Sequence, residues 1–187
     1  ITWCKFILLM TDLLVLFSSL FIAYDVLDIA RDGRFYFPLE EFDIYVLIHA
    51  CISIVGVLWF WIRLRHYTYR KPFWFELKEI FRTLVILFII ELAIVAFSRL
   101  YVSRYFWSIT WCCIFILLPF ARVMVKKLLI KTGMYLKETI IIGNGRNAKE
   151  VFDALNNESY LGFDIKLFVT TEDYDSEFIE HIPVMRH

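Results

Sequence analysis

The sequence lacks net charge and lacks any pair of cysteines spaced to hold a metal. Its 20 Lys and Arg balance 20 Asp and Glu, so the total charge indicates no oppositely charged partner, and we expect no nucleic acid. The four cysteines are Cys4, Cys51, Cys112 and Cys113. They form no C-x-x-C motif and lie in or beside apolar runs, so we assign no disulfide framework and no metal ligand.

Apolar residues, in contrast, are in excess. The chain is 60% hydrophobic, whereas an ordinary soluble domain is about 45–50% apolar. This composition excludes a disordered chain and a simple water-soluble globule. Residues 1–133 hold 15 Lys and Arg against 10 Asp and Glu, and residues 134–187 hold 5 against 10. We therefore expect two domains in different solvents, a transmembrane domain over 1–133 and a cytoplasmic domain over 134–187.

Four apolar runs are long enough to predict membrane spans. A helix needs about 20 residues to cross the hydrocarbon layer. The predicted spans are residues 6–24, 44–62, 80–97 and 105–125. No small-residue cleavage site follows the first run, and three more spans come after it, so a cleaved signal peptide explains it poorly. The expected fold class is a four-helix transmembrane bundle followed by an α/β domain.

The distribution of basic residues predicts the orientation of the spans. Segments that would lie inside hold twelve Lys and Arg, and the two loops that would lie outside, around 25–43 and 98–104, hold four. Because Lys and Arg concentrate on the cytoplasmic side, we expect both termini in the cytoplasm.

The basic connection between the second and third spans predicts structure of its own. Pro72 suits a first helical position, and apolar residues follow it with helical spacing at Phe73, Leu77, Ile80 and Phe81. We expect an amphipathic helix lying on the inner membrane surface before the chain turns into the third span. Its basic neighbours fit either anchoring to anionic lipid or recognition of a lipid phosphate. The candidates for phosphate recognition are Arg63, Arg65, His66, Arg70 and Lys71.

Three ionisable residues fall within the predicted spans: Asp12, His49 and Glu91. Such side chains are costly in hydrocarbon and usually face the bundle interior. They indicate interhelical hydrogen bonds or, less well supported, a proton relay. We expect no basic partner for them at mid-depth.

The chain beyond Pro119 changes its pattern. We interpret Arg122 and the lysines that follow it as a basic helix leaving the membrane, with Gly133 as a left-handed C-cap. Residues 139–142 and 164–169 predict strands, and residues 148–155 predict a helix between them. Strand, glycine turn, helix and strand within about 30 residues are typical of the start of a Rossmann-like domain.

The glycine turn matches the pattern G-x-G-x-x-A and predicts a phosphate site. The candidate cofactor-binding residues are Gly143, Asn144, Gly145, Arg146 and Asn147. Glycines let the backbone approach a phosphate, and unpaired N–H groups at a helix N-terminus attract the anion. The acid expected after the second strand is poorly placed, with Glu172 as the nearest residue. Nucleotide binding and a purely structural turn therefore both remain open.

Both ends of the sequence indicate a longer polypeptide. The chain begins with Ile1 rather than Met, and we expect only two strands and one helix before residues 182–184. Two parallel strands cannot bury both faces of a sheet. We therefore expect this chain to be the N-terminal region of a larger protein.

The basic connection also resembles a known family. Residues 60–67 read FWIRLRHY, and residues 70–83 read RKPFWFELKEIFRT. Together with the turn at 140–147 and residues 162–164, they are similar to the undecaprenyl-phosphate galactose phosphotransferases. The resemblance implies a bacterial inner-membrane protein whose full-length form moves hexose-1-phosphate from a UDP-sugar to undecaprenyl phosphate. That reaction starts the synthesis of lipopolysaccharide O-antigen, capsule or exopolysaccharide.

The resemblance also implies where the chemistry lies. In that family a magnesium-dependent catalytic domain follows further along the chain, so no catalytic residue and no cofactor of the reaction is expected among these 187 residues. The implied partners are membrane lipid, undecaprenyl phosphate and a UDP-sugar, and a homo-oligomer is left open. The alternatives are the N-terminal region of a membrane-bound nucleotide-sugar dehydratase and a separate membrane nucleotide sensor.

Overall fold

A computed structural model describes residues 2–30, 39–98, 102–143, 145–170, 178–179 and 182–186. The chain divides into two compact units, Thr2–Val125 and Lys126–His187, each of which is described separately. Among the predicted features, Asn144, Glu172 and residues 31–38 of the first outside loop lie outside the described residues.

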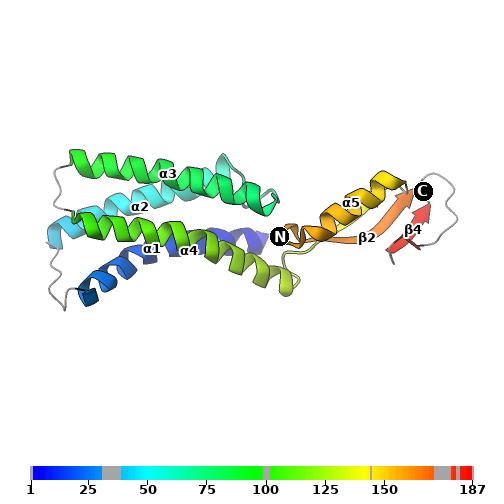
Figure 1. Ribbon diagram of the computed structural model, residues 1–187, viewed down its shortest axis with the longest axis horizontal. Helices are drawn as coiled ribbons and strands as arrows, with labels where there is room; N and C mark the ends of the chain where they lie inside the picture. The colour runs from blue at the N-terminus through cyan, green and yellow to red at the C-terminus, as the bar shows by residue number, and fades with distance from the viewer. Residues whose placement is uncertain are drawn as a thin grey trace. The chain divides into compact units, whose positions relative to one another are not determined.

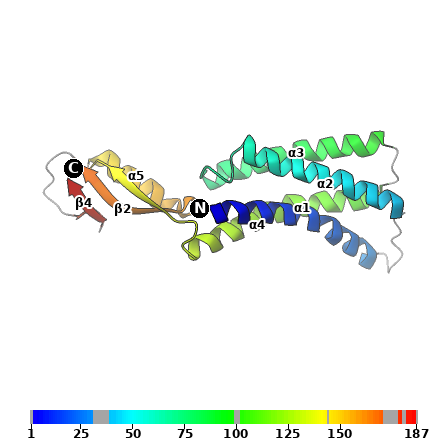
Figure 2. The same ribbon diagram turned by 180° about the vertical axis from the view of Figure 1, so that it is seen from behind.

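Four long helices form the first unit: α1 (Thr2–Ala30), α2 (Leu39–Ile62), α3 (Phe73–Phe97) and α4 (Arg104–Lys131), of which α4 continues into the second unit. They run alongside one another in Figures 1 and 2. Each helix has at least 22 residues that are apolar enough to cross a membrane. At about 1.5 Å per residue, such a helix exceeds the roughly 30 Å of a hydrocarbon layer. The structure thus confirms the prediction of four helices that are long and apolar enough to span a membrane.

Close packing holds α2 against α3. A Cβ atom added at Gly56 of α2 would lie 2.6 Å from Cδ1 of Leu87 on α3, so a side chain there would force Leu87 to move. Further along the unit, the helices enclose a core of buried residues, which are Leu20, Ala23, Leu27, Tyr45 and Phe106. Tyr45 and Phe106 pack edge to face with their ring centroids 5.6 Å apart.

The predicted surface helix is wrong as a separate element. The residues from Phe73 to Phe97 form one continuous helix, so the amphipathic segment is the first three turns of α3. No glycine or proline interrupts this stretch, and nothing else in it breaks the helical hydrogen bonds. Ile80 is buried within the unit, as are the polar Glu76 and Thr83, whereas Phe81 is 39% exposed, so burial in the bundle accounts for only part of the apolar periodicity.

A small sheet with one long helix forms the second unit. Its elements are β1 (Lys137–Ile142), α5 (Arg146–Asn157), the 3-10 turn η1 (Ser159–Leu161), β2 (Phe163–Thr170), β3 (Phe178–Ile179) and β4 (Ile182–Arg186). The strand order is β1-β2-β4-β3. β1, β2 and β4 are parallel, and β3 is antiparallel to β4. Helix α5 covers the sheet through Ala148, which packs with Ile141 and Phe168 in a buried core.

The expectation of only two strands is also wrong. β4 is a third parallel strand, paired with β2 through residues 184–186. Pro183 obscured it in the sequence, because a proline cannot donate to a β-ladder. Pro183 precedes the residues that pair with β2, so its missing N–H breaks none of those bonds, and it lies opposite Phe178 of the short strand β3. The confirmed part is a small parallel sheet of three strands, and a Rossmann-like domain is not confirmed.

Gly133 and Gly143 are among the described glycines that adopt a positive φ. Gly133 follows α4 with φ of 76° and donates its N–H to Ile130 O at 3.0 Å, which agrees with the predicted C-cap. Gly143 has φ of 120°, a conformation that side chains rarely adopt. Gly145 has φ of −80° and ψ of −177°, and nothing lies within 4 Å of an added Cβ.

This difference predicts opposite responses to the same substitution. Gly143→Ser should destabilise the second unit by about 1–3 kcal/mol, because it forces a side chain into a strained backbone region. Gly145→Ser should change stability by less than about 0.5 kcal/mol, since serine accepts this backbone and is a good N-cap. Amide hydrogen exchange of β1 and α5 in the detergent-solubilised chain measures both. Equal exchange rates in the two variants would contradict the assignment.

Candidate functional site

A buried ion pair joins the first helix to the last. Asp12 on α1 and Arg122 on α4 are 0% and 2% exposed. Arg122 Nε donates to Asp12 Oδ1 at 2.8 Å, and Nη2 donates to Oδ2 at 2.5 Å. The guanidinium also lies 4.4 Å from the centre of the Phe60 ring. A bidentate pair of this kind fixes both distance and orientation.

The connection between α2 and α3 also contacts this ion pair. Tyr67 donates its hydroxyl hydrogen to Asp12 Oδ2. Burial and the Asp12 carboxylate raise the pKa of the Tyr67 hydroxyl. The hydroxyl therefore stays protonated and remains a donor to the carboxylate.

Arg122 continues the network to α3. Its Nη1 donates to His66 Nδ1 at 2.6 Å and to Glu76 Oε1 at 3.3 Å. Because a guanidinium can only donate, His66 Nδ1 must accept, and the ring proton lies on Nε2. Nε2 then donates to Glu79 Oε2 at 2.7 Å, which also accepts from Lys71 Nζ at 2.5 Å. We call Asp12, His66, Tyr67, Glu76, Glu79, Lys71 and Arg122 the ion cluster.

A second polar group lies deeper in the bundle. His49 Nε2 donates to the Leu16 carbonyl at 3.1 Å, and Nδ1 lies 3.0 Å from Glu91 Oε2. Tyr45 donates to Glu91 Oε1 at 2.7 Å. Since the carbonyl can only accept, His49 Nε2 carries a proton, and one further proton is shared between Nδ1 and Glu91. The group links α1, α2 and α3, and it has no net charge in either arrangement of that proton.

These contacts confirm the prediction of interhelical hydrogen bonds for Asp12, His49 and Glu91. The expectation that they have no basic partner is wrong, because His49 pairs with Glu91 and Arg122 pairs with Asp12. Arg122 was assigned to a helix leaving the membrane, yet it is buried. Arg122 lies four residues after the buried Leu118, so both side chains lie on the same buried face of α4.

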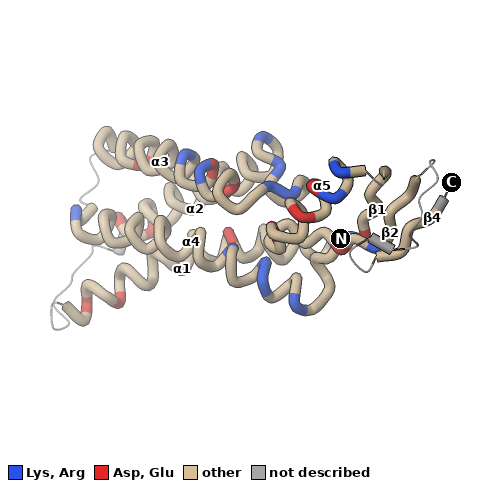
Figure 3. The backbone as a smooth tube through the Cα atoms, turned by 45° about the vertical axis from the view of Figure 1, so that its right-hand side comes forward, with Lys and Arg blue, Asp and Glu red and all other residues tan. Residues whose placement is uncertain are grey.

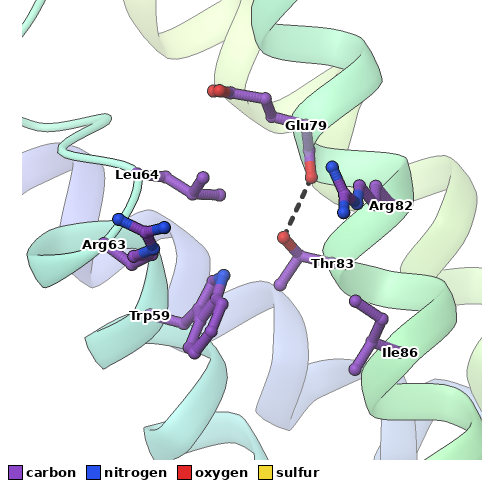
Figure 4. A pocket seen from close by; sticks show the side chains of 7 residues that line it. All are labelled: Trp59, Arg63, Leu64, Glu79, Arg82, Thr83 and Ile86. Atoms are coloured by element: carbon purple, nitrogen blue, oxygen red, sulfur yellow. Dashed lines mark hydrogen bonds between the residues drawn. The ribbon is translucent and has the colours of Figure 1, made fainter.

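A pocket of about 450 Å³ lies beside the ion cluster (Figure 4). It is lined by Trp59, Arg63, Leu64, Glu79, Arg82, Thr83 and Ile86. Of the five residues predicted to recognise a lipid phosphate, Arg63 lines this pocket. His66 and Lys71 belong to the ion cluster, and Arg65 donates to the Tyr69 hydroxyl at 3.3 Å. The sequence prediction omitted Arg82, which α3 brings to the same pocket.

The described part of the glycine turn has the form of a strand-to-helix turn. Gly143 donates its N–H to Val169 O at 2.7 Å, and Gly145 precedes the first residue of α5. Arg146 is 90% exposed and donates from Nε to Glu150 Oε1 at 2.9 Å. The structure therefore does not test the phosphate site, which stays a prediction for these residues and for Asn147. Within the described ranges, no three His, Cys, Asp or Glu residues are placed to hold a metal ion.

The ion cluster predicts a large cost for breaking its central pair. Arg122→Met should destabilise the first unit by about 3–5 kcal/mol, because Asp12 would stay buried without its cation. The double variant Asp12→Asn/Arg122→Met should recover part of that loss. Tryptophan fluorescence during denaturant unfolding in detergent measures both.

Lys127→Met provides a control on the same helix, since Lys127 is exposed. Its effect should stay within about 0.5 kcal/mol. An Arg122→Met variant as stable as Lys127→Met would show that the pair does not hold the helices together.

No protein-family profile matches the chain. A protein of Haemophilus influenzae named "Uncharacterized sugar transferase" is 49% identical over 183 residues, which are 97% of this chain and 39% of that protein. The undecaprenyl-phosphate galactose phosphotransferase of Salmonella typhimurium is 46% identical over 187 residues, which are 98% of this chain and 38% of that protein.

A third relative is the UDP-galactose-lipid carrier transferase of Erwinia amylovora. It is 47% identical over 131 residues, which are 70% of this chain and 28% of that protein. The chain thus spans about two fifths of the length of the first two relatives. None of the three is named a dehydratase, so the alternative enzyme class is not favoured. The resemblance is confirmed: along nearly its whole length, the chain is a homologue of the bacterial sugar transferases that include undecaprenyl-phosphate galactose phosphotransferase.

Proposed function

We propose that this chain is the N-terminal membrane and regulatory region of a polyprenyl-phosphate hexose-1-phosphate transferase. The observation that carries the proposal is 46% identity over 98% of the chain with an undecaprenyl-phosphate galactose phosphotransferase. A second relative is named a UDP-galactose-lipid carrier transferase, which favours the same donor sugar. The full-length protein is then an enzyme of bacterial surface polysaccharide synthesis, including lipopolysaccharide.

In the proposed reaction, an oxygen of undecaprenyl phosphate attacks the β-phosphorus of UDP-galactose. A new P–O bond to the lipid forms, the bond between the two phosphates breaks, and UMP leaves. The product is a lipid-linked galactosyl diphosphate. Within the described residues, no three His, Cys, Asp or Glu side chains come together to hold a metal ion, and we expect the magnesium ion to bind in the catalytic domain of the full-length protein.

The first unit would place this enzyme in the inner membrane. In the first unit, Lys and Arg residues gather around the α2–α3 connection, whereas acidic residues mark the far end of α1 (Figure 3). Because basic residues favour the cytoplasmic side, this charge separation supports cytoplasmic termini. We expect the ion cluster to keep the helix ends in register on that side.

The glycine turn would bind the phosphate of a nucleotide. The first N–H groups of a helix have no partner within the helix, and α5 begins directly after Gly145. The open space at the Gly145 Cβ position leaves room for a ligand. A purely structural turn would share this backbone, so a ligand experiment is required to separate the two.

A chimera tests the proposed function. We would replace the matching region of the Salmonella relative by this chain and assay membrane vesicles for UMP release from UDP-galactose with undecaprenyl phosphate. The chimera should release UMP, whereas the 187-residue chain alone should not. A chimera that inserts and folds but remains inactive would contradict the assignment, and activity of the chain alone would reveal a catalytic site within it.

A second experiment tests the glycine turn in the same chimera. Millimolar UDP-galactose should slow amide exchange at the start of α5, because a ligand at 100 times its Kd adds about 2.7 kcal/mol of stability. Gly145→Val should remove this protection and leave the exchange of the ligand-free protein unchanged, since the backbone there accepts a side chain. Unchanged exchange in the folded wild type would leave the turn with a structural role only.

A further inference from the structure

The pocket between α2 and α3 is lined by two arginines, Arg63 and Arg82, that do not belong to the ion cluster. In Figure 4, Trp59 and Arg63 face it from the α2 side, and Glu79, Arg82 and Ile86 belong to α3. Arg63 directly follows the last residue of α2, and its N–H donates to Trp59 O at 3.1 Å. The two arginines therefore come from opposite sides of one cavity of about 450 Å³.

Both guanidinium groups are available to a ligand. Arg63 and Arg82 are exposed, and within the described ranges neither side chain has a hydrogen bond or ion pair. An arginine in a protein stays protonated, so the pocket holds two unneutralised cations. Their planar forks match the oxygens of a phosphate better than a point charge does.

The acid that lines the pocket does not cancel this charge. Glu79 Oε2 accepts from His66 Nε2 at 2.7 Å and lies 2.5 Å from Lys71 Nζ. The ammonium group of Lys71 therefore already neutralises the negative charge of Glu79. Thr83 donates its hydroxyl to the Glu79 carbonyl at 2.9 Å, the bond drawn in Figure 4. The remaining electrostatic character of the pocket is positive.

Part of the remaining lining is apolar and belongs to the candidate membrane-spanning helices. Trp59 and Ile86 lie within the candidate spans of α2 and α3 and are 47% and 45% exposed. An anion that enters from water would gain little from these walls. A molecule with a phosphate at one end and a hydrocarbon chain at the other would satisfy both parts of the pocket.

We propose that this pocket binds the phosphate of a membrane lipid, with Arg63 and Arg82 holding the phosphate and with Trp59 and Ile86 contacting the first part of the hydrocarbon chain. A glycerophospholipid and a polyprenyl phosphate both offer this chemistry. The site lies outside the glycine turn and does not depend on the transfer reaction, so loss of UMP release in the chimera would leave this proposal standing.

Lipid binding to the purified full chain tests the proposal. Native mass spectrometry in detergent would give Kd values for phosphatidylglycerol, undecaprenyl phosphate and diacylglycerol, and inorganic phosphate would be added as a competitor. At least one phosphate lipid should bind, diacylglycerol should bind at least about 10-fold more weakly, and inorganic phosphate should compete poorly. The lipid with the lower Kd identifies the source of the phosphate. Equal binding of diacylglycerol would overturn the proposal.

A pair of matched double variants separates this pocket from general attraction to basic residues. Arg63→Gln/Arg82→Gln should weaken binding of the phosphate lipid about 10-fold or more. Arg65→Gln/Lys78→Gln removes the same charge from exposed neighbours that do not line the pocket, and should retain Kd within about twofold. Equal losses in both variants would show non-specific electrostatic attraction and would overturn the site.

A third variant keeps the result interpretable if the glutamine variant unfolds. Arg63→Lys/Arg82→Lys keeps the charge and loses the planar forks, so binding should weaken by less than in the glutamine variant. Trp59→Ala should weaken lipid binding without changing the competition by inorganic phosphate. Full retention of lipid affinity in both of these variants would contradict the assigned contacts.

Discussion

The buried pair between Asp12 and Arg122 is the interaction on which the rest of the first unit depends. An ionised side chain without a partner is costly inside a bundle, so α1 and α4 must meet at one depth. The residues are 110 positions apart, and the pair therefore fixes the two ends of the unit in space. Tyr67 and Glu76 contact the same pair, which holds the α2–α3 connection and the first turn of α3 in place.

The ion cluster also determines the charge of the pocket, because Glu79 belongs to both. Lys71 and His66 both bond to Glu79, so this carboxylate is directed toward the cluster. Arg63 and Arg82 consequently keep their full charge, although an acid lies in the same lining. A cation in place of His66 would compete with Arg122, whose Nη1 needs an acceptor at His66 Nδ1. Because His66 is neutral, it adds no third cation to the ion cluster. Arg122 therefore pairs with Asp12 and Glu76, and Lys71 pairs with Glu79, without repulsion from the histidine.

Local patterns in the sequence predicted the elements, and contacts distant in sequence decided the rest. Hydrophobic length identified all four helices, and the strand–turn–helix pattern identified β1, α5 and β2, because both signals arise from neighbouring residues. The partner of Asp12 could not be predicted, since Arg122 was read with the lysines that follow it. The same limit applied to α3, whose first turns carry apolar residues that match a membrane surface and the bundle interior equally well. β4 was missed because its pairing depends on β2, and Pro183 is a poor strand former.

Anchoring in a bilayer does not by itself require charged groups buried between the helices. Uniformly apolar helices would hold a protein in a bilayer without the cost of burying charged groups, and they could slide past one another. A bidentate arginine, a histidine in one tautomer and a tyrosine donor each accept few geometries, so together they favour a single helix register. In that register Arg63 at the end of α2 and Arg82 on α3 face the same cavity. The buried charges therefore do more than join the spans, because they also fix the helices that carry the two exposed arginines of the pocket.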